Sequence, residues 1–339
     1  MTVLVTGGSG LVGSHVIEAL RARGEPVRAL VRPGAGEAVT RLGAEPVAGD
    51  ATDPEAWRRA AQGARAIIHA AALVSPRDPY ERFVTVNVDA TRLAARAARA
   101  EGARLVHISS VAVYGRTAAV AVGGGRGRVT ETFAFQPLHE RDFYARTKRL
   151  AEDLVQEEAA REGLNVIVLR PNVIYGERDR LFTPKVIRVT RFGIVPLVGP
   201  GATHLACVYA GNVAAAVLAA VDAPGGGFRA YNVTEDAPPA LDQREFISAF
   251  GDALGVRVRR VPISPALARA GVGVWTAWLR LRDPSRYAGL GRAAVSFLMT
   301  DNPYVCDRAR AELGWRPPFG TREAIARTVA WYRTQARAS

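Results

Sequence analysis

Tyr144 and Lys148 are the pair whose residue types and spacing most directly suggest catalysis. Lysine is rare in this chain, because 43 of its 45 basic residues are arginines and only Lys148 and Lys185 are lysines. A spacing of four residues places the two side chains on one face of a helix. A tyrosine with its ordinary pKa of about 10 is a poor base at neutral pH, but a nearby ammonium favours the phenolate. The pair therefore predicts a group that moves a proton to or from a substrate oxygen.

Two serines add a candidate hydroxyl to this pair. Ser109 and Ser110 end an apolar run, residues 103–110, that is typical of a buried strand. Ligands bind at the carboxyl ends of the strands in parallel sheets, so a serine there can hold and polarise a substrate oxygen. The serines, Tyr144 and Lys148 together predict proton transfer coupled to hydride transfer with a nicotinamide cofactor.

A glycine-rich loop predicts where that cofactor binds. Gly7, Gly10 and Gly13 are spaced Gly-x-x-Gly-x-x-Gly between a β-rich run, residues 2–7, and a helical run, residues 11–24. Gly7 permits a sharp strand-to-helix turn, Gly10 lets the backbone approach a pyrophosphate, and Gly13 lets the helix pack close to the strand. The N-terminus of the helix then offers free N–H groups to the phosphates.

The residues after the next strands indicate which dinucleotide is preferred. NAD sites commonly carry an acidic residue at the end of the second strand, where it binds the ribose hydroxyls. This chain has Val31 and Arg32 there instead. An arginine fork can bind a 2′-phosphate, so we predict NADP in preference to NAD; the alternative is that Arg32 stacks on adenine or faces solvent. Asp50 could accept a hydrogen bond from the adenine amine, and the small residues 70–72 would let the cofactor pass close to the backbone.

These residues need a scaffold that brings strand ends together. Apolar runs alternate with helical runs through the first half of the chain, which predicts an α/β fold with a Rossmann-type, doubly wound parallel sheet. We assign residues 1–172 to a dinucleotide-binding domain, with parts of residues 205–235 completing its core. Residues 173–339, where the alternation weakens, are expected to form mainly a smaller, mixed C-terminal region that binds the substrate.

Two segments suggest less regular roles. Residues 115–131 are glycine-rich and predict a mobile loop. Residues 262–299 contain many apolar side chains, including Trp275, Trp278 and Leu279. They fit a lid over a hydrophobic substrate, ordinary core helices, or a segment that associates with a membrane surface through its Trp and Arg residues.

Composition limits the classes of partner. With 48% hydrophobic and 23% charged residues, the chain is typical of a globular protein. It shows no signal-peptide pattern and no transmembrane run, and its two cysteines, Cys207 and Cys306, lie far apart. We therefore expect a cytoplasmic protein without a disulfide framework or a metal site. The net charge is +13, but the arginines are scattered, which argues against nucleic acid and favours an ordinary solvated basic surface. The alternative is that the charge attracts an anionic ligand, such as a phosphate-rich cofactor.

Seven stretches of the sequence together resemble one family. They are "TGGSGLVG", "GDATD", "HAAALV", "NVDAT", "ISSVAVYG", "YARTK" and "LRPNVIYG", and they occur in this order between residues 6 and 176. The set resembles the extended short-chain dehydrogenase/reductase family of the NAD-dependent epimerase/dehydratase superfamily. A later stretch, "VYAGNVAAAVLAA", is similar to the 3β-hydroxysteroid dehydrogenase and dihydroflavonol reductase-like branch. Sugar-nucleotide epimerases more often have two aspartates where this chain has Gly211 and Asn212.

The resemblance implies roles for individual residues. Ser110 would be the catalytic hydroxyl, because it lies four residues before the tyrosine of "VYG", and Tyr144 would be the general acid/base. Lys148 would bind the nicotinamide ribose and tune Tyr144, while residues 171–173 would cradle the nicotinamide. The predicted catalytic residues are Ser110, Tyr144 and Lys148. The predicted cofactor-binding residues are Gly7, Ser9, Gly10, Leu11, Val12, Gly13, Arg32, Asp50, Ala51, Ala70, Ala71, Ala72, Ser109, Tyr144, Lys148, Pro171 and Val173.

Three functions remain open on this basis. The first is an NADP-dependent oxidoreductase that interconverts a ketone and a secondary alcohol on a hydrophobic substrate, such as a steroid, polyketide or flavonoid. The second is a sugar-nucleotide epimerase or dehydratase that retains NAD. The third is a non-catalytic dinucleotide sensor or a basic RNA-binding relative, against which the intact Ser, Tyr and Lys set argues. The resemblance also implies a homodimer that uses helices beside the active site.

Overall fold

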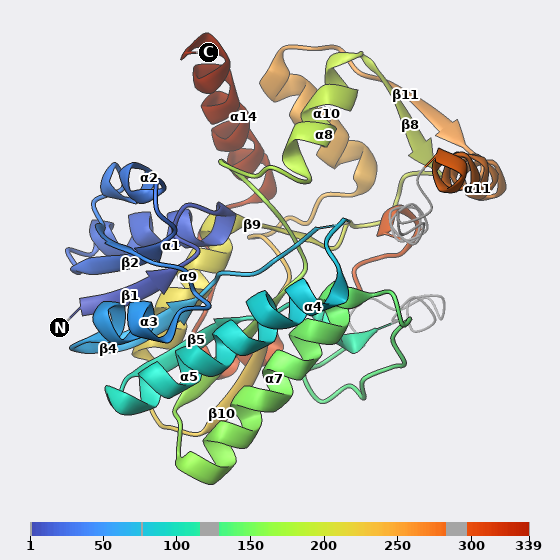
Figure 1. Cartoon of the computed structure of the whole chain (residues 1–339). Coiled ribbons are helices and arrows are strands. Elements are labelled where there is room, and N and C mark those ends of the chain that lie inside the picture. The colour runs from blue at the N-terminus through green and yellow to red at the C-terminus, as the bar shows by residue number, and fades with distance from the viewer. Residues whose placement is uncertain (1, 76, 116–128, 283–296, 339) are drawn as a thin grey trace.

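A parallel sheet forms the centre of the N-terminal part of the molecule (Figure 1). The computed structural model describes residues 2–75, 77–115, 129–282 and 297–338. Within these residues, seven strands pair in the order β10-β6-β5-β4-β1-β2-β3, and every pairing is parallel. The strands are β1 (Thr2–Thr6), β2 (Val27–Val31), β3 (Glu45–Ala48), β4 (Ala64–His69), β5 (Arg104–Ile108), β6 (Val166–Pro171) and β10 (Phe228–Val233). The predicted Rossmann-type, doubly wound sheet is confirmed.

The central strands are covered on both faces because their sequences are almost entirely apolar. All six residues of β6 are buried, and so are the last four residues of β1 and of β5. The strand order reverses between β1 and β4, with β2 and β3 on one side and β5, β6 and β10 on the other. Ligands of such sheets bind outside the carboxyl ends of the strands at this reversal. Gly7 and Ala70 directly follow the two strands that flank it.

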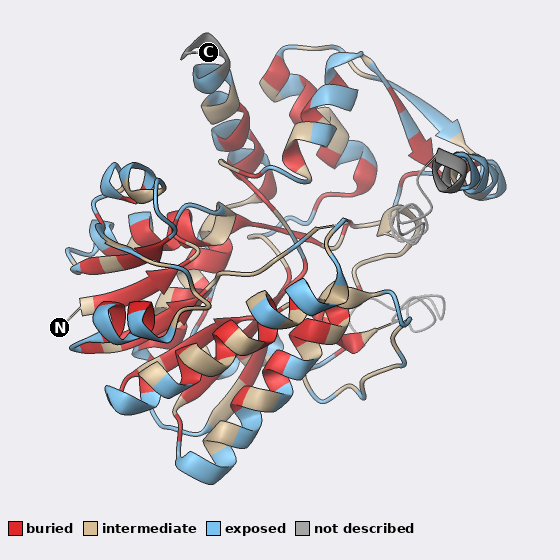
Figure 2. Ribbon diagram, viewed as in Figure 1, coloured by how far each residue is buried: buried red, intermediate tan, exposed pale blue. Residues whose placement is uncertain are grey.

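Helices pack on both faces of the sheet. On one face α1 (Leu11–Ala22) packs against α9 (Ala210–Asp222), and the other face is covered by α3 (Pro54–Ala61), α5 (Ala90–Ala100) and α7 (Phe143–Glu162). Figure 2 shows these helices buried on the side toward the sheet and exposed on the outer side. Asp53 caps α3 by accepting the N–H of Glu55, as predicted. The shorter elements are α2 (Gly36–Thr40), α4 (Tyr80–Phe83), the π-helical η1 (Val84–Asp89), the 3-10 helix η2 (Val111–Tyr114) and α13 (Asp307–Leu313).

A C-terminal lobe lies beyond the carboxyl ends of the sheet strands (Figure 1). Its core is aromatic and aliphatic and includes Tyr175, Phe246, Phe250 and Val329. A two-stranded pair, β7 (Val173–Tyr175) with β9 (Cys207–Tyr209), continues from β6 toward this lobe. The lobe contains α8 (Thr183–Arg191), β8 (Ile194–Val198), α10 (Gln243–Leu254), β11 (Arg259–Ile263), α11 (Pro265–Arg282) and α14 (Thr321–Ala338). Strands β8 and β11 pair in parallel as a separate ribbon.

The structure departs from the sequence-based expectation in two places. The helical run that begins at Asn87 starts as a π-helical turn before α5, and this turn directs the Asn87 side chain inward. The apolar segment 262–299 is not a core helix where it is described, because most side chains of α11 with a described position are exposed. Residues 283–296 of that segment and residues 116–128 of the predicted mobile loop lie outside the described residues. No helix in the described ranges has both the length and the apolar character needed to cross a membrane.

Candidate active site

The glycine loop after β1 is shaped by close backbone approaches. Gly7 has a φ of +70°, and a Cβ atom there would lie 2.8 Å from the backbone nitrogen of Ala71. A Cβ at Gly13 would lie 2.3 Å from the carbonyl oxygen of Gly7, so only glycine lets α1 begin this close to β1. The sharp turn predicted at Gly7 and the close helix packing predicted at Gly13 are therefore both present in the structure.

The N-terminus of α1 fits a pyrophosphate. Gly10 is the N-cap and offers no side-chain cap, and the first turn carries no acidic residue. The N–H groups of this turn, at Leu11 and Val12, are therefore not blocked by a carboxylate. Ser9 and Gly10 are exposed, while Leu11 and Val12 are partly exposed. This combination of open backbone donors and a helix dipole is what a phosphate-rich cofactor requires.

The end of β4 is tied to the same loop. Ala71 donates its N–H to the hydroxyl of Thr6 at 3.3 Å, and Thr6 also bonds the Nδ1 atom of His69 at 2.8 Å. Ala70, Ala71 and Ala72 are only partly buried. The predicted small-residue segment and the glycine loop thus lie next to each other at the reversal of strand order.

A cluster of charges lies where the adenosine end of a dinucleotide would be. Arg32 is exposed directly after β2, and Asp50 is exposed after β3. The backbone N–H and hydroxyl of Thr52 bond the Asp50 carboxylate at 2.9 and 2.8 Å, and these bonds, together with the positive charges of Arg32 and Arg82, lower its pKa. The carbonyl of Ala51 accepts the indole N–H of Trp57 at 2.7 Å. Arg82, from α4, was not predicted from the sequence.

The predicted catalytic residues meet at the carboxyl end of β5. Ser110 is the N-cap of η2, and its hydroxyl accepts the N–H of Ala112 at 3.2 Å. Ser110 and Tyr144 are both partly exposed. Burial of the phenol raises the pKa of Tyr144 to about 12, and the nearby Ser110 hydroxyl opposes this only in part. Tyr144 therefore stays protonated at neutral pH in the chain by itself.

Lys148 lies one turn further along α7 and is buried. Its Nζ atom donates to the carbonyl of Ile108, the last residue of β5, at 2.6 Å. Burial lowers the pKa of Lys148 to about 8, although the carboxylate of Glu152 favours the charged form. The ammonium has three donors, and Ile108 is its one hydrogen-bond partner among the described residues.

One sequence-based expectation does not hold for the chain by itself. The ammonium of Lys148 was expected to lower the pKa of Tyr144, but that pKa is raised to about 12. The physical reason is that loss of water around the phenol outweighs the polar groups that favour the phenolate. Spacing along a helix specifies that two side chains share a face, but it does not specify how strongly the surrounding protein excludes solvent.

Glu152 and Arg170 form a buried ion pair below the catalytic residues, and neither was predicted. The Nε atom of Arg170 lies 3.0 Å from a Glu152 oxygen, and both side chains are almost fully buried. Ser109 donates its hydroxyl to the same carboxylate, so this serine faces Glu152 inside the protein. Arg170 also donates to the Tyr114 hydroxyl at 2.9 Å. Glu152 could have been found, because it continues the four-residue spacing from Tyr144 through Lys148.

Asn87 connects the end of β4 to the catalytic helix. Its side-chain oxygen accepts the N–H of Leu73 at 2.7 Å, and its amide donates to the Leu73 carbonyl and to the Thr147 hydroxyl at 3.2 and 3.1 Å. Because Thr147 precedes Lys148, this buried amide fixes α7 relative to the segment that contains Ala70. The stretch "NVDAT" was noted in the sequence, but no role was assigned to this residue.

The segment after β6 contributes one unpaired oxygen. Pro171 is buried and Val173 is exposed at the start of β7. Between them, Asn172 donates its amide to the Thr234 carbonyl at 2.8 Å, while its side-chain oxygen is buried without a partner among the described residues. An unpaired buried acceptor beside Pro171 and Val173 is compatible with a ligand that supplies an N–H there.

Two histidines near Lys148 are not candidates for proton transfer. His69 and His107 are buried and stack with ring centroids 5.7 Å apart. Burial, assisted by the charge of Lys148, lowers the pKa of His69 to about 3 and that of His107 well below its usual value. Both rings are therefore neutral at physiological pH.

Comparison with known proteins identifies the family. The model of the NAD dependent epimerase/dehydratase family matches residues 3–234, which is more than half of the chain. The chain belongs to this family. It is an NAD(P)-dependent oxidoreductase of the extended short-chain dehydrogenase/reductase type, as the sequence predicted.

Similar proteins of this family include reductases, dehydrogenases and epimerases. A 4-hydroxy-2-methyl-3-oxo-4-farnesyl-3,4-dihydroquinoline-1-oxide ketoreductase of Stigmatella aurantiaca is 35% identical, covering 93% of this chain and 92% of that protein. A 3-beta-hydroxysteroid dehydrogenase of Mycolicibacterium neoaurum is 30% identical, covering 97% of this chain and 91% of that protein. The structure of the Thermus thermophilus UDP-glucose 4-epimerase in complex with NAD has a TM-score of 0.70 and 26% identity, covering 98% of this chain and 99% of that one.

Proposed function

We propose that this enzyme interconverts a ketone and a secondary alcohol on a hydrophobic substrate, with NADP(H) as the preferred cofactor. The observation that supports this most directly is that the Ser110 hydroxyl lies close enough to Tyr144 to act on its pKa, with Lys148 one turn away on the same helix. The nicotinamide cofactor, when bound, supplies or accepts the hydride. Relatives named as a ketoreductase and a hydroxysteroid dehydrogenase support the choice of a hydrophobic ketone or alcohol.

The proton chemistry favours reduction at neutral pH. Tyr144, with its pKa raised to about 12, is a protonated phenol that can donate to a ketone oxygen as it gains negative charge. Ser110, beside the phenol, would hold the same oxygen. Oxidation of the alcohol needs the phenolate and is expected to become faster as the pH rises.

Lys148 has the donors needed to orient the cofactor. One of its three N–H groups is used by the Ile108 carbonyl, which fixes the ammonium beneath the end of β5. The remaining donors would bind the ribose hydroxyls of the nicotinamide half. Asn172, with its unpaired buried oxygen, would accept an N–H from the same half of the cofactor.

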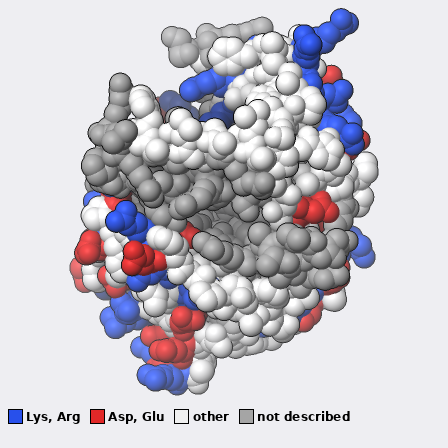
Figure 3. Space-filling model, turned by 90° about the vertical axis from the view of Figure 1, so that its right-hand side faces the viewer, with Lys and Arg blue, Asp and Glu red and all other residues white. Residues whose placement is uncertain are grey.

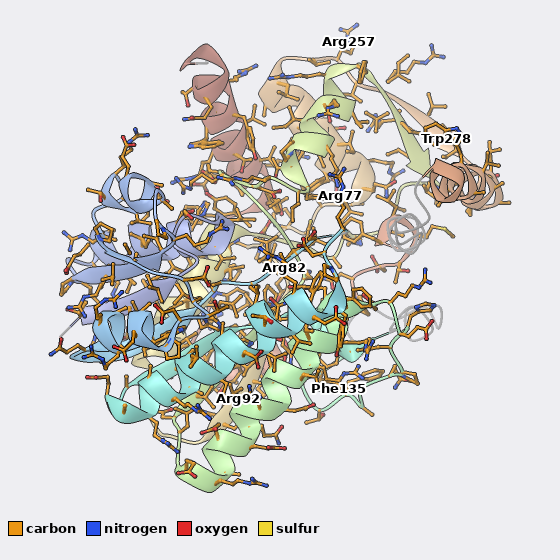
Figure 4. The ribbon with its side chains drawn as sticks, in the orientation of Figure 1. Arg77, Arg82, Arg92, Phe135, Arg257 and Trp278 are labelled. Carbon is orange, nitrogen blue, oxygen red and sulfur yellow. The ribbon has the colours of Figure 1, made fainter. Side chains whose placement is uncertain are left out.

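The preference for NADP is supported by two arginines at the adenosine end. The charges of Arg32 and Arg82 both lower the pKa of Asp50, and Arg82 also forms an ion pair with Asp78 at 3.1 Å. Figure 4 shows Arg77 and Arg82 on the side of the sheet that faces the C-terminal lobe. Guanidinium groups bind phosphate well, whereas no carboxylate stands at Val31 or Arg32 to bind a free ribose hydroxyl.

The experiment that tests the proposal is a screen of hydrophobic ketones and alcohols with NADPH and NADH. We expect ketone reduction that consumes NADPH in proportion to product, with the cofactor released after each turnover. An enzyme that instead retains bound NAD and converts a sugar nucleotide without net consumption of cofactor would be an epimerase, and the proposal would be wrong. The Asn212 side chain is buried and donates to Asp236 and to the Phe319 carbonyl, so it holds segments of the fold together.

A further inference from the structure

Helix α11 presents an apolar stripe to solvent. Leu267, Val274 and Trp278 are spaced at i, i+7 and i+11, so their side chains share one face of the helix. They are 63%, 73% and 47% exposed. Figure 4 shows Trp278 at the outer edge of the molecule, far from the sheet. A stripe of large apolar side chains on one face of a helix indicates a surface that something else covers.

The ribbon of β8 and β11, which leads into α11, also carries exposed apolar side chains. Val195 and Leu197 are buried and alternate with Ile194, which is 58% exposed, so the opposite face of β8 is open. Val261 of β11 is also exposed, and Phe192, just before β8, is 77% exposed. Within the described residues, eight of the eleven exposed large apolar side chains belong to residues 181–278 of the C-terminal lobe. The concentration in one lobe argues against random scatter.

The same segments are strongly basic. Residues 180–200 and 256–282 contain ten Lys or Arg residues and none of the 32 acidic residues of the chain. Arg257, Arg259 and Arg260 are exposed, and Arg259 pairs in register with Ile194, so charge and apolar surface adjoin. Figure 3 shows uncharged side chains across the upper half of this side of the molecule, with Lys and Arg along its upper margin.

We propose that α11 and the β8–β11 ribbon form a docking face for an anionic lipid bilayer. An amphipathic element with apolar and aromatic residues beside arginines lies in the interface of a membrane, and its arginines are attracted by anionic headgroups. Leu267, Val274 and Trp278 enter the headgroup region, while Arg257 and Arg259 bind lipid phosphates. This docking does not depend on the proposed reaction, since it uses none of the residues assigned to proton transfer or to cofactor binding.

Two other occupants fit this face less well. A second copy of the chain in a two-fold dimer would place the same basic patch against itself, with no acidic partner in the two segments. Nucleic acid would satisfy the arginines, but it would leave the stripe of Leu267 and Val274 exposed to water. An anionic bilayer is the occupant that satisfies both the charge and the apolar surface.

Flotation of the full chain with lipid vesicles tests the proposal. We expect binding to vesicles of phosphatidylcholine mixed with phosphatidylglycerol, weaker binding to phosphatidylcholine alone, and loss of the difference at high salt. The double variant Leu267→Glu/Val274→Glu should reduce the partition coefficient at least about tenfold, because it removes the apolar contact. The triple variant Arg257→Glu/Arg259→Glu/Arg260→Glu should reduce it at least about a hundred-fold.

A matched control tests whether vesicle binding depends on this local surface or only on the net charge of the protein. Arg41, Arg58 and Arg316 are exposed outside this lobe, and reversing all three changes the net charge by the same amount. This control triple should bind anionic vesicles nearly as well as the parent, and thermal melting confirms that each variant is folded. The proposal is overturned if the two triples bind equally, or if the parent ignores every vesicle. It is also overturned if Leu267→Glu/Val274→Glu merely converts a dimer to a monomer in solution.

Discussion

Two long helices of this enzyme break the rule that polar residues face water and apolar residues face the core. Helix α7 buries Lys148 and Glu152 against the sheet, while α11 exposes Val274 and Trp278. In the first case the buried charges have partners: the Ile108 carbonyl, Arg170 and Ser109. In the second case the described residues leave Leu267 and Val274 mostly exposed. Both departures are informative, because buried polar groups and exposed apolar patches indicate function more often than ordinary surface residues do.

The two regions also differ in how their charged side chains are placed. On α7 the charges of Lys148 and Glu152 are held in fixed positions away from water, and burial lowers the pKa of Lys148. On β11 and just before it, the charges of Arg257, Arg259 and Arg260 are exposed and of one sign, so in the proposed docking face they would act together on a large partner. The first arrangement suits chemistry at one atom, and the second suits attraction to a surface.

Removal of the Tyr144 hydroxyl on α7 should have the largest effect on catalysis. Tyr144→Phe is expected to lower kcat for ketone reduction by about a thousand-fold, because the proton donor is lost while packing is kept. Steady-state kinetics with NADPH measures this. Tyr80→Phe is a matched control, since Tyr80 packs on Phe143 beside the site and its ring lies under Arg146. Full activity in Tyr144→Phe would remove the catalytic assignment.

Removing one partner of the buried Glu152–Arg170 ion pair should destabilise the α7 region. Glu152→Gln is expected to lower the free energy of unfolding by about 3–5 kcal/mol, because it leaves the buried Arg170 guanidinium without its carboxylate. Urea denaturation measures this change. The double variant Glu152→Leu/Arg170→Met should recover most of the loss, since both charges are then absent. If the single variant is as stable as the parent, the pair does not hold the helix.

Lys148→Arg tests whether activity requires the compact shape of the lysine ammonium in addition to its positive charge. We expect kcat/KM for reduction to fall by about ten- to a hundred-fold, because the broad guanidinium cannot replace the compact ammonium beneath Ile108. In the parent, Lys148 has a pKa of about 8, so it is charged below that pH, and kcat/KM should be flat there and decline above it. Tyr144, with a pKa of about 12, stays protonated throughout.

The pH profile of the arginine variant provides the control for this assignment. Arginine keeps its charge well above pH 8, so the residual activity of Lys148→Arg should no longer decline there. If the decline near pH 8 persists in the variant, another group causes it, and Lys148 is not the titrating residue.

A substitution at the predicted adenosine end of the cofactor site should have a smaller effect, seen in cofactor binding. Arg32→Ala is expected to weaken NADPH binding by about tenfold and to leave NADH binding nearly unchanged, because only NADPH carries the 2′-phosphate. Titration of each cofactor by fluorescence measures both constants. Arg28→Ala is a useful comparison, since Arg28 on the same strand bonds the carbonyls of Ala60 and Gln62. An equal loss for NADH and NADPH in Arg32→Ala would contradict a preference for NADP.

The smallest effect is expected for a leucine of the exposed stripe. Leu267→Ala should change the free energy of unfolding by less than about 0.5 kcal/mol, because the side chain is mostly in water. Leu105→Ala, in the fully buried β5, should cost about 2–5 kcal/mol. Thermal or urea denaturation compares the two. A large loss for Leu267→Ala would mean that α11 packs against the protein in solution, and the docking face would have to be abandoned.

Much of the scaffold could be predicted because its signals are local. The alternation of apolar and helical runs indicated the parallel sheet, and the spacing of Gly7, Gly10 and Gly13 indicated a turn that only glycine can make. The short elements β7, β8 and β9 were not predicted, since strands of three to five residues form here by pairing with segments distant in sequence. Arg82 was missed for the same reason, because nothing near it in the sequence relates it to Asp50.

The sequence by itself determined the residue types and the helical spacing of Tyr144 and Lys148, and it determined the family through stretches that each lie within a few residues. These features depend on neighbours along the chain. Only the tertiary structure decided that Tyr144 is held as a neutral phenol, that Glu152 is neutralised by Arg170, and that the apolar face of α11 points outward. Each of these depends on how completely distant segments exclude water, and exclusion of water is a property of packing in three dimensions.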